Sequence, residues 1–307
     1  MVSFIVLVIG FVLLVWGADK FVEGAAAAAR RFGVSPLLVG LTIVAFGTSA
    51  PELAVSATAA LKGANEIALG NVIGSNIFNL LVVAGLSAVF CPLKMDKTLL
   101  RRDWPLSVGA AVLMLALMAA GGGLSQPDGL ILLACFAAVM VAQIRPALRE
   151  RAPAPTETVT MRGSLIALNI VLGLACIVIG GQCAVDGATG IARMFGLSET
   201  LIGLTIVAFG TSLPELATSV AAARKGQTDI AMGNVIGSNL FNILLILGAS
   251  AGLHAIPVQT TGLIDALVLI VVSVLFYLPA RRGKIGRGTG AVMALTYVCY
   301  TAYLILR

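Results

Sequence analysis

The sequence predicts an all-α polytopic membrane protein of ten transmembrane helices, arranged as two inverted repeats of five helices. Hydrophobic residues occupy 59% of the 307 positions and charged residues only 11%, whereas an average soluble domain has about 25% charged residues. The apolar residues form ten runs with charged residues between them. In addition, residues 40–56, GLTIVAFGTSAPELAVS, recur as GLTIVAFGTSLPELATS at residues 203–219, with fifteen of seventeen positions identical. The chain is therefore expected to consist of two related halves that lie in a lipid bilayer.

The charge pattern excludes nucleic acid as a partner. The formal net charge is +6, but Lys and Arg stand in short clusters between apolar runs, as in the cytoplasmic loops of membrane proteins. The five cysteines include no CxxC pair, so we interpret them as small apolar residues of the core. The single histidine, His254, has no second imidazole with which to form a zinc site.

The first five spans follow from the apolar runs and the residues that interrupt them. Arg30 and Arg31 end the first span, and Gly47 and Pro51 break the second. A charged connection at residues 94–103 follows the third span, and GGGLSQPD is a turn signal between the fourth and fifth. The expected spans are residues 2–29, 36–61, 65–90, 105–120 and 129–144.

The second half repeats this plan after a polar, proline-rich linker. We divide the chain into an N-terminal repeat at residues 1–150, a cytoplasmic linker at 151–162 and a C-terminal repeat at 163–307. The most similar parts of the halves cover about residues 36–90 and 199–253. The linker is too short for a soluble regulatory domain, so none is expected. The spans expected in the second half are residues 164–193, 200–223, 229–252, 263–278 and 289–306.

The positions of Lys and Arg predict the orientation. If the amino terminus is outside, the outer loops hold only Lys62, Arg193 and Arg307. The inner loops then hold sixteen basic residues: Arg30, Arg31, Lys94, Lys97, Arg101, Arg102, Arg145, Arg149, Arg151, Arg162, Arg224, Lys225, Arg281, Arg282, Lys284 and Arg287. Because basic loops remain in the cytoplasm, both termini are expected on the outer side of the cell membrane.

The same count predicts that the repeats are inverted. Five spans separate the start of one copy from the start of the other, and an odd number means that the copies cross the membrane in opposite directions. Inverted repeats with broken helices that meet at the midplane are typical of secondary transporters, because exchanging the conformations of the two halves changes the side to which the site opens.

Each copy places one glutamate, Glu52 or Glu215, in an apolar span. An ionisable group inside the membrane costs roughly 2.5 kcal/mol or more and usually marks an ion path. The next span of each copy carries a polar stripe with a spacing of four residues, which places the stripe on one helix face. The stripe residues are Asn71, Ser75 and Asn79 in the first copy and Asn234, Ser238 and Asn242 in the second.

The prolines of the repeated motif are expected to expose backbone oxygens. Pro51 and Pro214 have no amide hydrogen and clash with the preceding turn, so carbonyls of the preceding turn, at Gly47 or Ala45 and their counterparts Gly210 or Ala208, are expected to be free. Unpaired backbone at this depth is tolerated only where it lines a cavity. The two carboxylates with nearby amide, hydroxyl and carbonyl oxygens suit Ca²⁺, which takes 6 to 8 oxygen ligands.

The paired motifs GTSAPEL with GNVIGSNIFN and GTSLPEL with GNVIGSNLFN resemble the two alpha-repeats of the cation/calcium exchanger superfamily, nearest its prokaryotic sodium/calcium exchangers. The resemblance covers nearly the whole chain and implies a ten-helix antiporter that carries Ca²⁺ against Na⁺, with the ions as transported substrates and no cofactor. The ligands that it implies, matched by motif position, are Glu52, Glu215, Thr48, Ser49, Thr211, Ser212, Ser75, Ser238 and the carbonyls of Ala45 and Ala208, with Asn79 and Asn242 in the same site.

One departure from the family pattern leaves the coupling ion open. Sodium-coupled members often carry aspartate at the position of Asn79 or Asn242, and here both are asparagine. Two carboxylates neutralise one Ca²⁺, two Na⁺ or two protons, so a calcium/proton antiporter is the alternative to sodium coupling. The closer resemblance of the motifs favours sodium.

Two other classes fit the sequence less well. A cation channel would also use broken helices with free carbonyls, but channels usually build filters by rotational assembly, whereas an internal inverted repeat favours alternating access. An intramembrane enzyme would need a nucleophile with a base, and the only histidine is expected in a loop. We therefore expect no enzyme.

Overall fold

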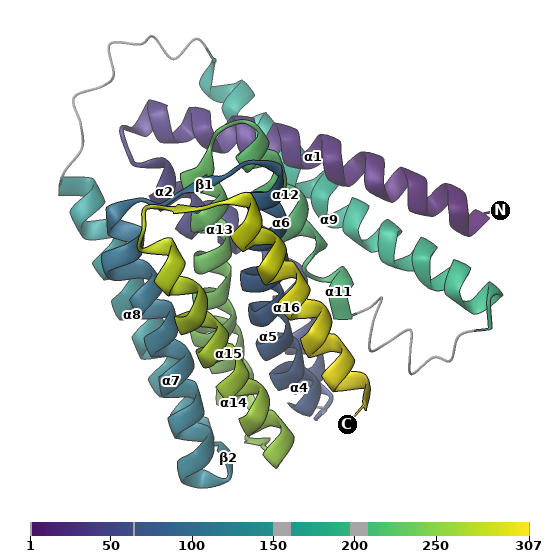
Figure 1. Ribbon diagram of the computed structural model, residues 1–307, viewed down its shortest axis with the longest axis vertical. Coiled ribbons are helices and arrows are strands. Elements are labelled where there is room, and N and C mark those ends of the chain that lie inside the picture. The colour runs from purple at the N-terminus through teal and green to yellow at the C-terminus, as the bar shows by residue number, and fades with distance from the viewer. Residues whose placement is uncertain (1, 64, 150–160, 197–207, 307) are drawn as a thin grey trace.

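The computed structural model describes residues 2–63, 65–149, 161–196 and 208–306. Two long helices, α1 and α9, lie side by side and cross a bundle formed by the other helices at an oblique angle (Figure 1). In the first half the helical segments are α1 (Val2–Phe32), α2 (Pro36–Val39), η1 (Gly40–Val44), α3 (Ala45–Thr48), α4 (Ala50–Leu61), α5 (Asn65–Phe78), η2 (Asn79–Val83), α6 (Ala84–Phe90), η3 (Leu99–Asp103), α7 (Trp104–Gly121) and α8 (Gln126–Arg149), where η denotes a π-helix.

The second half follows a similar order in the part that the structure describes. Its helical segments are α9 (Gly163–Met194), α11 (Ala208–Gly210), α12 (Leu213–Arg224), α13 (Thr228–Leu240), η5 (Phe241–Leu247), α14 (Gly248–Leu253), α15 (Thr260–Ala280) and α16 (Arg287–Leu306). Four two-residue strands join the helix ends: β1 (Leu93–Lys94), β2 (Gly123–Leu124), β3 (Ile256–Pro257) and β4 (Lys284–Ile285).

The part of the chain that the structure describes contains eight helices long and apolar enough to cross a membrane, and a ninth if the bent pair of residues 36–48 and 50–61 is one span. The remaining expected span, residues 200–223, begins outside the described residues. Most of the expected linker at 151–162 also lies outside them. The mostly helical architecture of a multi-pass membrane protein is thus confirmed.

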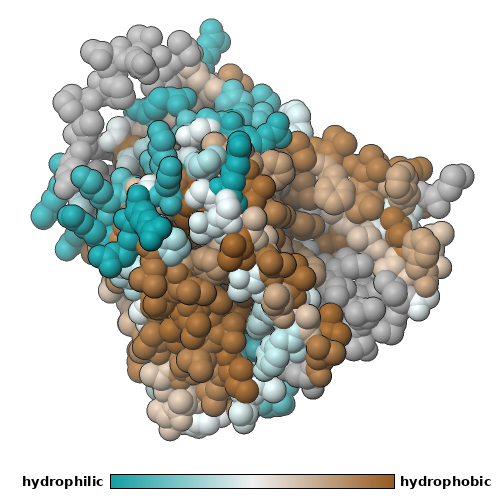
Figure 2. Space-filling model, viewed as in Figure 1, coloured by the Kyte–Doolittle hydropathy of each residue, from teal (hydrophilic) through white to brown (hydrophobic). Residues whose placement is uncertain are grey.

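The two spans that follow the glutamate-bearing helices form the centre of the molecule. The span from α5 to α6 is 78% buried and the span from α13 to α14 is 94% buried over its most apolar window, whereas α16 is only 11% buried. The apolar residues of the outer helices face outwards and give the bundle a hydrophobic surface, with hydrophilic residues concentrated at the end near β1 (Figure 2). Such a surface is matched to lipid.

Glycines bring α1 and α9 into close antiparallel contact. A Cβ atom on Gly17 would lie 2.8 Å from the carbonyl oxygen of Gly173, and one on Gly10 would lie 2.8 Å from that of Gly180. Small residues at a helix interface let two backbones approach closely in a membrane, where van der Waals contact drives association. The two helices therefore pack as one unit along most of their length.

The break in the second span lies where the sequence predicts it. Ser49 has φ −82° and ψ 8° between α3 and α4, Pro51 stands in the first turn of α4, and the two parts of the span are bent by 48°. In the second half, Ser212 has φ −93° and ψ 6° just before α12, and Pro214 stands in the first turn. Each break is followed directly by the turn that carries the glutamate.

The fourth span was expected to begin at about residue 105, after the charged connection at residues 94–103, but in the structure the helical span begins earlier, at Leu99. The side chain of Asp96 accepts the backbone N–H groups of Thr98 and Leu99 at 2.6 and 3.3 Å, as a helix cap does. The helical segment η3 therefore starts at Leu99 and includes Arg102 and Asp103.

The strands pair the connections of one half with those of the other. β1 pairs with β4 so that Lys94 lies opposite Lys284, and β2 pairs with β3 so that Leu124 lies opposite Ile256. β1 lies at the upper end of the bundle and β2 at the lower end (Figure 1). The connections that contain β1 and β4, both expected on the cytoplasmic side, are thus adjacent.

Candidate ion-binding site

The two glutamates lie at the centre of the bundle, and each is held by the opposite half of the chain. Glu52 and Glu215 stand in the first turns of α4 and α12, and both are 0% exposed. The Ser212 hydroxyl donates to Oε1 of Glu52 at 3.0 Å, and the Ser49 hydroxyl donates to Oε1 of Glu215 at 3.0 Å. The two helix breaks therefore face each other, and each orients the carboxylate of the other.

The second carboxylate oxygen of each glutamate, Oε2, has no hydrogen-bond partner among the described residues. Buried polar atoms in proteins are nearly always partnered, and each exception calls for an explanation. A buried carboxylate oxygen without a donor is suited to bind a cation, since a positive charge satisfies it where a hydrogen bond does not.

The threonine beside each serine contacts the polar stripe of the opposite half. The Thr48 hydroxyl donates to Oδ1 of Asn234 at 3.0 Å, and the Thr211 hydroxyl donates to Oδ1 of Asn71 at 3.5 Å. Each asparagine in turn donates to the backbone carbonyl of the glutamate on the preceding helix, at 3.4 Å for Asn234 and 3.3 Å for Asn71. The asparagines thus connect both glutamate-bearing helices across the interface between the halves.

The remaining stripe residues are buried, and several of their polar atoms have no partner. The Ser238 hydroxyl donates to the glutamate of α12 at 3.4 Å, whereas the Ser75 hydroxyl has no partner among the described residues. The side-chain oxygens of Asn79 and Asn242 are also without one. Asn79 is the first residue of η2, and Asn242 is the second residue of η5. π-helical turns of this kind occur often at functional sites.

The structure supports the expected backbone carbonyl ligands less clearly than the side-chain ligands. The Ala45 carbonyl accepts the backbone N–H of Ser49 at 3.0 Å and the Thr48 hydroxyl at 3.4 Å, so it is not free of hydrogen bonds as the sequence suggested. Pro51 has no N–H to offer the Gly47 carbonyl, which leaves that oxygen the better candidate. Ala208 opens α11, directly after residues outside the described part, and the role of its carbonyl stays a prediction.

The sequence analysis missed a second set of polar residues. Asn76 and Asn239 each donate to the backbone carbonyl of the other at 3.2 Å, and Oδ1 of Asn76 also accepts the amide of Asn242 at 3.0 Å. Ser56 and Ser219 accept the amides of the stripe asparagines at 3.0 and 2.9 Å. These residues position the site. The signal that could have found them is their identity in both copies of the repeat.

The charge of the site comes from the two glutamates alone. Among the described residues there is no group of three or more His, Cys, Asp or Glu side chains that could hold a metal ion. Serine, threonine and asparagine oxygens provide the other candidate ligands, and this all-oxygen set suits a hard cation.

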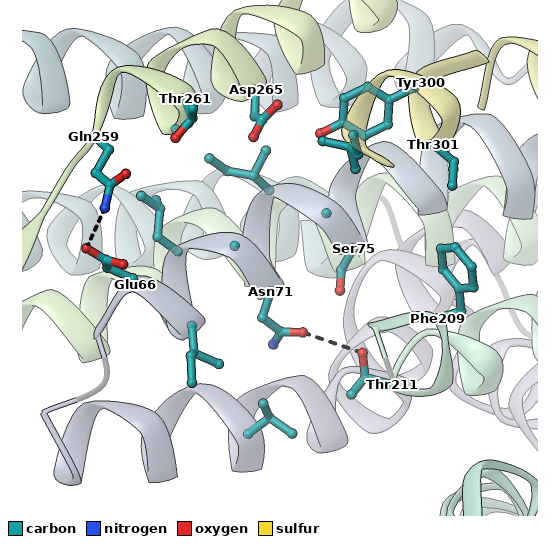
Figure 3. Close-up of a pocket in the computed structure, with 18 of the residues that line it drawn as sticks. Glu66, Asn71, Ser75, Phe209, Thr211, Gln259, Thr261, Asp265, Tyr300 and Thr301 are labelled. Carbon is teal, nitrogen blue, oxygen red and sulfur yellow. Dashed lines mark hydrogen bonds between the residues drawn. The ribbon is translucent and has the colours of Figure 1, made fainter. Parts of the chain in front are cut away.

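A cavity of about 560 Å³ leads to one side of this site. Asn71, Ser75 and Thr211 line its inner part, and Glu66 lines its outer part, where the Gln259 amide donates to it at 3.1 Å (Figure 3). Figure 3 shows the side chains of Asn71 and Thr211 pointing toward each other, with the hydrogen bond between them drawn as a dashed line. The half-site around Asn71 is thus adjacent to open space, whereas Asn234 is fully buried.

This difference predicts unequal effects of two equivalent substitutions. We expect Asn234→Leu to lower the free energy of unfolding by about 1–3 kcal/mol, because its hydrogen-bond partners are left buried and unsatisfied. Asn71→Leu should cost less, because water in the cavity can replace the lost amide. Thermal unfolding of both purified variants would measure this, and equal losses would contradict the difference in solvent access.

The site consists of buried carboxylates among neutral oxygens, and helices with an apolar outer surface surround it. These features define the chain as a multi-pass membrane protein of the transporter class. The sequence profile of the sodium/calcium exchanger protein family matches residues 2–145 and 165–306. The chain belongs to this family. Its fold is that of the sodium-calcium exchanger NCX_Mj, whose structure after soaking with zero Na⁺ and Ca²⁺ superposes with a TM-score of 0.88 at 34% identity, over 98% of this chain and 99% of that one.

Three relatives show the range of names within the family. The chain is 39% identical to the putative antiporter CaxA of Alkalimonas amylolytica, over 98% of each sequence. It is 37% identical to the inner membrane protein YrbG of Escherichia coli, over 97% of this chain and 95% of YrbG. It is 35% identical to the sodium/calcium exchanger MaX1 of Methanosarcina acetivorans, over 99% of this chain and 98% of MaX1.

Proposed function

We propose that the protein exchanges Ca²⁺ for Na⁺ across the cytoplasmic membrane by alternating access, with Glu52 and Glu215 as the shared ligands of both ions. The observation that carries this proposal is the pair of buried carboxylates. Each is oriented by a serine of the opposite half, and each has an oxygen with no hydrogen-bond partner among the described residues. Two carboxylates neutralise either one Ca²⁺ or two Na⁺. One ion must therefore leave before the other binds, and this competition couples their fluxes.

The coordination shell that we propose uses oxygens that surround the glutamates. Ca²⁺ takes 6 to 8 oxygen ligands at roughly 2.3 to 2.6 Å, more than two carboxylates provide. The additional ligands are the hydroxyl or carbonyl groups of the helix breaks and the polar stripes: Thr48, Ser49, Thr211, Ser212, Ser75, Ser238, Asn79, Asn242, Ala45 and Ala208.

An inverted arrangement of ten helices is part of the proposal. β3 follows β1 at the repeat offset of 163 residues, and β3 pairs with β2 at the opposite end of the bundle from β1 (Figure 1). Equivalent connections at opposite ends are what an inverted repeat requires. The adjacent lysines of β1 and β4 and the excess of basic residues in the expected inner loops support a cytoplasmic location for that end and extracytoplasmic termini.

The glycine-lined pair of α1 and α9 is the mobile element in this proposal. Its helices contact each other far more extensively than they contact the bundle, so the pair is able to move as one body. A shift of this pair along the bundle would open the glutamates first to one side and then to the other, as alternating access requires.

Proton coupling is the second candidate, and Asn79 with Asn242 is the observation that favours it. Neither position carries the aspartate that sodium-coupled members often have, and the two remaining carboxylates are also sufficient for two protons. A cation channel is the third candidate. The following experiment distinguishes the sodium-coupled antiporter, the proton-coupled antiporter and the channel.

Calcium flux into proteoliposomes tests the coupling ion. We expect a sodium gradient to drive Ca²⁺ against its concentration gradient, and a proton gradient of equal size to drive little. The reverse result would establish the proton antiporter. Flux driven by an electrical potential alone, with neither gradient effective, would establish a channel.

Asn242→Asp is expected to change the preference for the coupling ion, because it adds a third carboxylate to a site that has two. The dependence of the calcium flux on the sodium concentration and on pH measures this change. The conservative variant Asn242→Gln serves as the control, since it keeps the amide. Identical profiles for Asn242→Asp and the unmodified protein would remove position 242 from the site.

A further inference from the structure

A second acidic pocket, of about 180 Å³, lies at the β1 end of the molecule, away from the glutamates. It is formed where the start of α2, the segment before η3, the end of α8 and the first turn of α13 meet. Asp96 and Asp229 line it together with Ser35 and Thr98, both of which are exposed, so the pocket is open to solvent.

Among the described residues that line this pocket, the one basic residue is already paired, so their net charge is negative. The guanidinium group of Arg102 donates to both carboxylate oxygens of Asp103, at 2.8 and 3.3 Å, and to the Ala142 carbonyl at 3.4 Å. This ion pair has no formal net charge, which leaves two negative charges, on Asp96 and Asp229.

A buried amide oxygen adds an independent signal for a ligand. Gln143 lines the pocket and is 1% exposed. Its Nε2 donates to Asp103 at 3.2 Å, which fixes the orientation of the amide, and its Oε1 has no hydrogen-bond partner among the described residues. An unpartnered buried acceptor beside two carboxylates calls for a donor or a cation.

The equivalent pocket in the other half explains what is missing here. At the repeat offset of 163 residues, Asp229 corresponds to Glu66 and Asp96 corresponds to Gln259. In that half the Gln259 amide donates to Glu66 at 3.1 Å, so the carboxylate is satisfied by the protein. Here a carboxylate replaces the amide. Oδ1 of Asp96 accepts the backbone N–H groups of Thr98 and Leu99, but Asp96 has no side-chain hydrogen to donate to Asp229, so the two carboxylates share one pocket as acceptors. A bound cation is the chemical replacement for the missing donor.

We propose that this pocket is a second cation site, which binds a hydrated divalent cation of the Mg²⁺ type through Asp96, Asp229 and the Gln143 oxygen. Mg²⁺ keeps several waters and is usually bound by one or two carboxylates, whereas Ca²⁺ needs more protein oxygens. The pocket provides two carboxylates and room for several waters. The ion would connect the segment before η3 to α13, the helix that carries Asn234 and Ser238, and so stabilise this end of the bundle.

Mn²⁺ binding to the full chain in lipid nanodiscs tests the proposal, because Mn²⁺ substitutes for Mg²⁺ and its free form is counted by electron paramagnetic resonance. The measurement uses Glu52→Gln/Glu215→Gln as the parent, so that it does not depend on the proposed transport site. We expect one Mn²⁺ per chain, displaced by Mg²⁺. No binding, or displacement by Ca²⁺ but not by Mg²⁺, would overturn the proposal.

Asp96→Gln in the same parent is the decisive variant, because it recreates the carboxylate–amide pair of the other half. It removes the cap that Asp96 provides to Thr98 and Leu99, but the equivalent Gln259 precedes α15 without such a cap, so the variant should fold without a cation. We expect it to lose Mn²⁺ binding completely, and its thermal stability to be insensitive to Mg²⁺, whereas Mg²⁺ raises the Tm of the parent. The matched control is Glu66→Gln, which changes the equivalent carboxylate of the other pocket and should bind Mn²⁺ like the parent. Unchanged binding by Asp96→Gln would overturn the assignment.

Discussion

Glu52→Gln is expected to abolish calcium uptake into inverted membrane vesicles, and Glu215→Gln is expected to do the same. Each change removes one of the two negative charges available to the ion and leaves a bound Ca²⁺ with an uncompensated positive charge. Such a charge inside a membrane costs roughly 2.5 kcal/mol or more, which corresponds to a loss of affinity of about 70-fold. The amide keeps the size of the side chain, so the hydrogen bond from the opposite serine is retained.

Glu23→Gln is the matched control for this experiment. Glu23 lies on α1, is partly exposed and pairs with Lys20 at 3.1 Å, where an exposed ion pair contributes little to stability. Uptake should remain close to that of the unmodified protein. Normal transport by both Glu52→Gln and Glu215→Gln would show that the buried carboxylates do not hold the transported ion.

Gly17→Ala should lower stability markedly, although alanine favours a helix more than glycine does. The added Cβ would lie 2.8 Å from the Gly173 carbonyl oxygen and 2.8 Å from the Cys176 Cβ, so α1 and α9 must separate to admit it. Overpacking of this kind costs about 1–3 kcal/mol. We expect a lower Tm in detergent, and reduced calcium uptake because separation of the two helices would impair their proposed movement as one body.

Gly109→Ala makes the same substitution where space is available. Gly109 lies in α7, and a Cβ atom there would meet no heavy atom within 4 Å. The higher helix propensity of alanine should then leave the Tm unchanged or raise stability by up to about 1 kcal/mol. A decrease of equal size in both variants would mean that the close approach of α1 and α9 is not the cause.

Much of the fold could be predicted because hydropathy and repeat identity act over long stretches. The third span was expected at residues 65–90, and the structure has helix from Asn65 to Phe90. The break at Ser49 followed from Pro51, whose ring cannot continue a helix. The π-helical turn that begins at Asn79 had no such signal, since it depends on how buried helices pack against each other.

The site was predictable in its charges but less so in its supporting residues. A glutamate in an apolar run stands out, because burying it alone is costly. Asn76 and Asn239 do not stand out, since their reciprocal hydrogen bonds exist only once both halves are assembled. Similarly, the sequence placed Asp96 only in a charged connection, because Asp229, which lines the same pocket, is distant in the sequence.

The serine that orients Glu52 also has a consequence for the order of biosynthesis. Ser212 lies 160 residues further along the chain than Glu52. Because synthesis adds about 5–20 residues per second, Ser212 is made roughly 8–32 s after Glu52. During that interval the N-terminal half has a carboxylate whose donor has not yet been made. The hydrogen bond to Glu52 therefore forms only after the second helix break has been synthesised, so the site is completed late in the synthesis of the chain.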